Sequence, residues 1–278
     1  MNTRALQTSF LRAAAAVIGW AAFIAVAQAH PLGSGRVFIG CPVYRNTSDG
    51  PKSGCWLAID NTDGIRYDIS MGRMKPQIGH EVMVEGELKL SGHKTTNGSV
   101  HTACGGVVLS PVVVSPLTRR CPAFILPADG YHGRKFILNL KDVLPPTYVP
   151  ERLPKPPFVA HTWHIEFTFD SDFLQYQYSE VILDQIARYI RAGHPKHVDI
   201  TGYALTQSQH ISGRSMAERP RLARERAEMV ALALRRLGVD PGIMTVRWKF
   251  NPQPLTSSSA LSAATRRRVD VRLTYKSK

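Results

Sequence analysis

The segment from Leu222 to Leu237 combines an apolar stripe with several arginines. At about 100° per residue, its apolar side chains fall on one face of a helix. Arg226 lies roughly 60° from the centre of this stripe, where a guanidinium reaches both the core edge and a ligand. Such a group binds a carboxylate through two parallel hydrogen bonds. The competing interpretation is a surface arginine paired with Glu225, Glu228 or solvent. The stripe consists of Ala223, Ala227, Val230, Leu234 and Leu237.

Motifs for nucleophilic or phosphate chemistry are absent from the sequence. There is no Gly-x-Ser-x-Gly elbow and no phosphate-binding glycine loop after a strand. His161 and His164 are three residues apart in or before a strand, so their side chains point to opposite faces and do not share a metal. We therefore expect no enzyme activity, no cofactor and no metal.

Residues 1–29 have the pattern of a cleaved signal peptide. Arg4 and Arg12 precede an apolar stretch at residues 13–25, and Ala27-Gln28-Ala29 follows as a cleavage site. The apolar stretch is shorter than the roughly 20 residues that span a bilayer, which disfavours an uncleaved anchor. We expect an exported protein.

Export changes the interpretation of the four cysteines, because thiols in an oxidising compartment usually form disulfides. Cys41, Cys55, Cys104 and Cys121 allow three pairings. We prefer Cys41 with Cys55 and Cys104 with Cys121, since each closes a short loop. A zinc site is the alternative, but no Cys-x-x-Cys spacing is present.

The chain has a formal net charge of +14, and two positive charges leave with the signal peptide. This charge suits an acidic partner such as an anionic wall polymer or lipid headgroups, and equally nucleic acid. Export disfavours nucleic acid, so none is expected.

Residues 35–143 read as short strands separated by turns rich in Gly, Asn, Asp and Pro. The clearest strand is Glu81 to Leu90, in which apolar and charged residues alternate. Five or six strands in this length predict a small all-β domain, an OB-like barrel or a sandwich. The other expected strands are Arg36 to Val43, Trp56 to Ile59, Arg66 to Ile69, Gly106 to Val114 and Lys135 to Leu140.

Residues 144–160 contain six prolines and predict a stiff linker, with a Pro-rich crossover packed on one domain as the alternative. Beyond it, residues 161–278 alternate between strand and helix patterns. Ile165, Phe167 and Phe169 share a strand face, and Ser179 is expected to cap the next helix. The full order is βαβαββ, which favours a mixed sheet covered by two helices. The overall fold class is therefore α+β.

Four segments of this C-terminal part, within residues 163–275, resemble the peptidoglycan-binding OmpA-like domain of outer membrane protein A. They are FTFDSD (167–172), VDITGY (198–203), LARERAEMV (222–230) and RRRVDVRL (266–273). The third is similar to the family's Leu-Ser-x-x-Arg-Ala-x-x-Val, and the fourth to its Asn-Arg-Arg-Val. The segments also occur in the family's order.

The resemblance implies a ligand and residues that bind it. Domains of this family bind the diaminopimelate residue of the peptidoglycan stem peptide. The end of this residue carries a carboxylate, which a guanidinium binds, and an amine, which a carboxylate binds. Arg226 matches the family's ligand-binding arginine, while Asp172 and Arg267 match polar positions on the ligand side. The family's acidic residue falls on Leu205, so Glu218 is the candidate substitute.

The resemblance therefore implies a non-catalytic periplasmic protein, associated with the wall and outer membrane. It would bind peptidoglycan and tether an envelope assembly, such as a secretion, conjugation or pilus machine, through contacts with other envelope proteins. The alternative is a binding module in which the basic N-terminal domain recognises a polyanion, glycan or protein, and the second domain is a scaffold. Tyr44, Trp56 and Tyr67 could form an aromatic platform for such a ligand.

Overall fold

The computed structural model describes residues 35–48, 54–89, 93–94, 100–101, 104–130, 153–175 and 177–275. Residues 32–278 cluster as one compact unit. The predicted signal peptide, the expected strand Lys135 to Leu140 and most of the Pro-rich segment lie outside the described residues.

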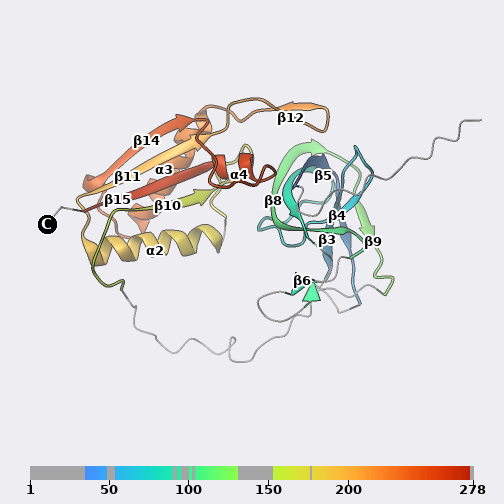
Figure 1. Ribbon diagram of the computed structural model, residues 1–278, viewed down its shortest axis with the longest axis horizontal. Helices are drawn as coiled ribbons and strands as arrows, with labels where there is room; N and C mark the ends of the chain where they lie inside the picture. Colours follow the sequence, from blue (N-terminus) through green and yellow to red (C-terminus); the bar gives the residue numbers. More distant parts are fainter. Residues whose placement is uncertain are drawn as a thin grey trace, which may run out of the picture. The chain divides into compact units, whose positions relative to one another are not determined.

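The N-terminal part is a seven-stranded sheet with the order β1-β5-β8-β4-β3-β2-β9 (Figure 1). The all-β prediction for this part is therefore confirmed. Its longest strands, β5 (His80–Leu88) and β8 (Val107–Arg120), pair antiparallel along most of their length. The remaining strands are β1 (Gly35–Gly40), β2 (Pro42–Arg45), β3 (Cys55–Ile59), β4 (Arg66–Asp68) and β9 (Phe124–Leu126). A separate two-stranded pair is formed by β6 (His93–Lys94) and β7 (Val100–His101).

Alternation along β5 forms the core of this sheet. Val82 and Val84 are fully buried and pack with Phe38 of β1 and Val114 of β8. Tyr67 is 1% exposed and its ring lies 5.2 Å from that of Phe38, so it belongs to the core rather than to an aromatic platform. Tyr44 and Trp56 instead form a partly buried edge-to-face pair with ring centroids 5.0 Å apart.

The C-terminal part is a four-stranded mixed sheet with the order β10-β15-β11-β14 (Figure 1). Its strands are β10 (His161–Glu166), β11 (His197–Ala204), β14 (Met244–Phe250) and β15 (Arg268–Thr274). Only the β11 and β14 pair is parallel. The main helices are α2 (Tyr178–Gly193) and α3 (Arg221–Arg236), which confirms the βαβαββ prediction. The short elements are the hairpin β12 (Gln209–Ile211) and β13 (Arg214–Met216), the 3-10 helix η1 (Pro241–Ile243) and α4 (Ser262–Arg266).

Both main helices pack on one face of this sheet. Ile186 of α2 and Val230 of α3 join Ile200 of β11 and Val271 of β15 in one buried cluster. The helix cap predicted at Ser179 is wrong, because the cap residue is Gln177 and Ser179 is buried within the first turn. The strand predicted through Phe169 ends at Glu166, and the chain then turns at Asp170, whose φ of 51° is in the left-handed region.

Candidate functional site

The position of Arg226 depends on a close approach between α3 and β11. A Cβ on Gly202 would lie 2.0 Å from the carbonyl oxygen of Ala223, so only glycine permits this packing. The glycine is followed by Tyr203, whose carbonyl oxygen accepts a hydrogen bond from Arg226. The Gly-Tyr pair at the end of the strand therefore brings the helix arginine to the end of the sheet.

Arg226 is fully buried, and each of its five guanidinium N–H groups has a partner. Nε donates to the carbonyl of Ser171 at 2.8 Å, and Nη1 and Nη2 donate to the carbonyls of Tyr203 and Thr168 at 2.9 and 3.2 Å. The two remaining bonds are a bidentate contact with Glu218, Nη1 to Oε2 at 3.0 Å and Nη2 to Oε1 at 2.6 Å. The guanidinium thus has no donor left for a ligand in this conformation.

Glu218 is the acidic partner in this buried pair. Its side chain is 0% exposed, and its oxygens also accept hydrogen bonds from the amides of Asp170 and Leu205, at 2.9 and 2.8 Å. The residue lies between β13 and α3, and its own amide donates to the Leu205 carbonyl at 3.0 Å. A carboxylate therefore contacts the backbone at Leu205, although the side chain at that position is apolar.

An exposed ion pair, Arg219 with Asp170, is adjacent to the buried pair through the neighbouring residue Glu218. Arg219, next to Glu218, donates from Nε to Oδ1 of Asp170 at 3.0 Å and from its backbone amide to the same oxygen at 3.2 Å. The side chains are 49% and 34% exposed. The hydrogen bond that Arg219 donates to Asp170 raises the pKa of Arg219, and the negative charges of Asp170, Glu225 and Asp172 add to the shift. The guanidinium of Arg219 is thus surrounded by three carboxylates, those of Asp170, Glu225 and Asp172.

Of the four ligand residues predicted from the sequence, the structure brings Arg226 and Glu218 into direct contact. Asp172 lies beside Arg219 at the surface. Arg267 is fully buried and forms an ion pair with Glu85 of β5. Burial lowers the pKa of Arg267, but the Glu85 carboxylate outweighs this effect and the net shift is upward.

Sequence reasoning did not single out the Asp170 and Arg219 pair. Two signals were available: Asp170 lies within the FTFDSD motif (167–172), and Arg219 directly follows the candidate acid Glu218. The contact between Asp170 and Arg219 depends on the left-handed turn at Asp170 and on the path of the chain after β13. No local sequence pattern specifies either of these.

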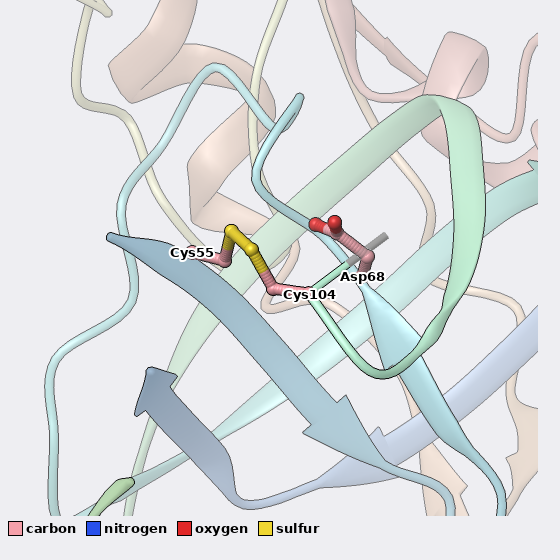
Figure 2. A group of neighbouring side chains, drawn as sticks. All are labelled: Cys55, Asp68 and Cys104. Carbon is pink, nitrogen blue, oxygen red and sulfur yellow. A yellow bond between two sulfur atoms is a disulfide. The ribbon is translucent and has the colours of Figure 1, made fainter. Parts of the chain in front are cut away.

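The preferred pairing of cysteines is wrong. The structure joins Cys55 to Cys104, with 6.1 Å between their Cα atoms, and leaves Cys41 and Cys121 as thiols. The expectation that each disulfide closes a short loop fails because the fold brings Cys55, at the start of β3, next to Cys104 in the turn before β8. Figure 2 shows the buried Asp68 carboxylate next to this disulfide, and the three residues lie close enough to be a metal-ligand set. Both sulfurs are bonded to each other, so no thiolate is left to bind a metal.

Among the described residues, no helix combines the length and apolar character needed to cross a membrane.

Comparisons with known proteins match the C-terminal part of the chain. The model of the OmpA family matches residues 166–268. Solved structures that are similar include the OmpA-like domain of FopA1 from Francisella tularensis subsp. tularensis SCHU S4, with 17% identity, 42% of this chain and 77% of that chain covered, and a TM-score of 0.33. The peptidoglycan-associated lipoprotein from Burkholderia pseudomallei has 29% identity, 40% and 89% coverage, and a TM-score of 0.32.

A third similar structure is the cell wall anchor of the T6SS from Pseudomonas aeruginosa, with 23% identity, 42% and 82% coverage, and a TM-score of 0.33. A search of curated proteins finds no match. The family match covers β11, α3 and two of the ion pairs described above, Arg226–Glu218 and Arg219–Asp170. Residues 166–268 of this chain form an OmpA-family domain.

Proposed function

We propose that this protein is a non-catalytic periplasmic component that binds peptidoglycan through its OmpA-family domain and tethers an envelope assembly to the wall. The observation that carries the proposal is the family match over residues 166–268, which contains Arg226 and a carboxylate bonded to it. The strongly basic chain favours anionic wall polymer over neutral surfaces.

We place the ligand contact at the exposed Asp170 and Arg219 pair, with Asp172 beside it. A zwitterionic stem-peptide end carries a carboxylate and an amine, and these can exchange partners with the guanidinium of Arg219 and the carboxylate of Asp170. Both side chains are accessible without unfolding any element. Arg226 and Glu218 would then fix the backbone at Asp170 and Leu205, which holds the exposed pair in place.

Direct ligand binding by Arg226 is a second version of the same proposal. It requires Glu218 to leave the guanidinium so that a ligand carboxylate can replace it. In this version the Glu218 carboxylate occupies the position on the Arg226 guanidinium that the ligand carboxylate would take. Arg267 would similarly have to leave Glu85 before it could contact ligand.

The test is retention of the full-length protein on purified sacculi in about 0.15 M salt, where the Debye length is about 8 Å. Arg219→Gln should lower affinity by several-fold, because it removes the guanidinium that would bind the ligand carboxylate. Arg224→Gln is the matched control. It removes the same charge from an exposed pair, Arg224 Nε to Glu228 Oε1 at 2.7 Å, and should leave retention unchanged.

Equal loss in both variants would mean charge attraction without a specific site, and retention that vanishes with modest salt would agree with that result. Unchanged retention for Arg219→Gln and Asp170→Asn would exclude the exposed pair. If a folded Glu218→Gln variant also binds normally, wall binding would be assigned to residues 35–143, as in the polyanion or glycan alternative.

We also propose that residues 35–143 are an OB-like barrel domain, joined by the 144–160 segment to a domain at 161–278. Only Cys41 separates β1 from β2, yet β1 pairs with β5 and β2 pairs with β3. Counting β1 and β2 as one bent strand, the hydrogen-bonded order returns to its start after five strands, as in a partly open five-stranded barrel. Nuclear Overhauser contacts across both pairings in one monomer would support closure, and loss of either set would exclude it.

A further inference from the structure

The two cysteines outside the disulfide occupy related places in the N-terminal sheet. Cys41 is the single residue between β1 and β2, and Cys121 directly follows β8. Both side chains are partly exposed. Neither residue lies close to the other in the sequence, so their relation is a property of the fold.

The strand register brings them together. β2 and β9 are parallel, with Val43 opposite Phe124. Cys41 lies just before β2 and Cys121 three residues before β9. If the register is continued two residues beyond this first pair, Cys41 falls opposite Pro122, which is next to Cys121. Neighbouring strands are about 4.8 Å apart, and disulfides form across Cα distances of about 4.4–6.8 Å. The two thiols lie close enough to interact, because Cys41 is one of the groups that raise the pKa of the Cys121 thiol.

Strand β5 fixes both positions from the other side. Gly40, the residue before Cys41, pairs with Val82 of β5. The amide of Cys121 donates to the carbonyl of Gly79, just before β5, at 3.0 Å. Neither cysteine therefore depends on a mobile loop for its placement.

We propose that Cys41 and Cys121 form a second disulfide, nested around Cys55–Cys104, in the exported protein. The cross-link would join the bend between β1 and β2 to the connection between β8 and β9. This inference does not depend on peptidoglycan binding.

The reaction is thiol–disulfide exchange with a disulfide oxidant, either a dithiol oxidase of the export compartment or oxidised glutathione. One thiolate attacks the oxidant and forms a mixed disulfide, and the second thiol displaces the oxidant's remaining sulfur. The two cysteines lose two protons and two electrons, and the oxidant's disulfide is reduced to two thiols. Burial, the contact with Cys41 and the charge of Glu81 raise the pKa of Cys121 to about 12, so we expect Cys121 to act second.

Peptide mapping tests the pairing directly, because trypsin separates all four cysteines. They fall in residues 37–45, 53–66, 95–119 and 121–134. The full-length protein would be purified after export, and in parallel refolded in a glutathione buffer, alkylated without reduction and digested. We expect a linked pair of peptides 37–45 and 121–134, lighter by two hydrogens than the separate thiols, and no alkylated cysteine.

Two variants complete the test. The double variant Cys55→Ser, Cys104→Ser should keep the linked pair, and Cys41→Ser should leave Cys121 as the only thiol that is alkylated. Recovery of 37–45 and 121–134 as separate alkylated peptides, while 53–66 and 95–119 remain linked, would overturn the proposal. Linkage of 37–45 to 53–66 would also overturn it.

Discussion

Removal of the Glu218 charge should strongly destabilise the C-terminal domain. In Glu218→Gln the side chain keeps its shape, but the buried Arg226 guanidinium loses its counter-ion. The carboxylate accepts four hydrogen bonds, two from Arg226 and one each from the amides of Asp170 and Leu205. In glutamine an NH2 group replaces one of the two acceptor oxygens. At least one of the four donors is therefore left without an acceptor.

The magnitude follows from the burial. Both side chains are 0% exposed, and removal of one partner of a buried ion pair costs about 3–5 kcal/mol, because the remaining charge is uncompensated. This is a large share of the roughly 5–15 kcal/mol that stabilises a typical domain. The matched control is Glu228→Gln, which breaks an exposed pair with Arg224 on the same helix and should cost about 0.3–0.5 kcal/mol.

The assay is urea unfolding of the full-length protein, followed by far-UV circular dichroism and by tryptophan fluorescence. A cost below about 1 kcal/mol for Glu218→Gln, similar to the control, would refute the description of this pair as buried and fully bonded. Glu218→Ala adds a second test, because it leaves a space beside two unpaired guanidinium donors. Sodium acetate should raise the melting temperature of this variant above that in sodium chloride, since a ligand that binds only the folded state stabilises it. No acetate effect would argue against exchange of Glu218 for a ligand carboxylate.

Two further perturbations address other parts of the structure. Cys55→Ala removes the disulfide with Cys104, which spans a sequence separation of 49, and should cost roughly 4 kcal/mol in urea unfolding, with the reduced wild-type protein as comparison; a cost near zero would contradict the pairing. Burial raises the pKa of Asp270, but hydrogen bonds from His164 and Arg268 outweigh it and hold the pKa below its usual range. The stabilisation is therefore present above about pH 4 and is lost as the pH falls below it. Asp270→Asn should show a smaller loss of stability between pH 4 and pH 2, and an unchanged pH profile would refute the role of this carboxylate.

Much of the fold was predictable because the periodicity of the sequence is strong. Val82 and Val84 of the predicted strand are buried, and so are four of the five residues of the predicted helix stripe. The fifth, Leu237, lies just beyond α3 and is 40% exposed. Gly238 lies just beyond α3 and has a φ of 86°, a left-handed conformation that is common for a glycine after a helix. Element ends were less predictable: Phe167 and Phe169 continue the alternation of β10 but lie beyond its last paired residue.

The candidate site was only partly predictable. Helix geometry placed Arg226 at the boundary of the apolar stripe, whereas the structure buries it completely. The difference arises because the turn at Asp170 and the segment at Glu218 close over the helix face, and both come from elsewhere in the sequence. A helical wheel contains no information about such segments.

By itself, the sequence determined the βαβαββ order of the C-terminal part, the strong positive charge and the presence of an arginine on an OmpA-like helix. Only the tertiary structure decided the partners: Glu218 for Arg226, Glu85 for Arg267 and Cys104 for Cys55. The physical reason is that periodicity records which face of an element is buried, whereas a hydrogen bond or disulfide depends on the distance between residues that chain folding brings together.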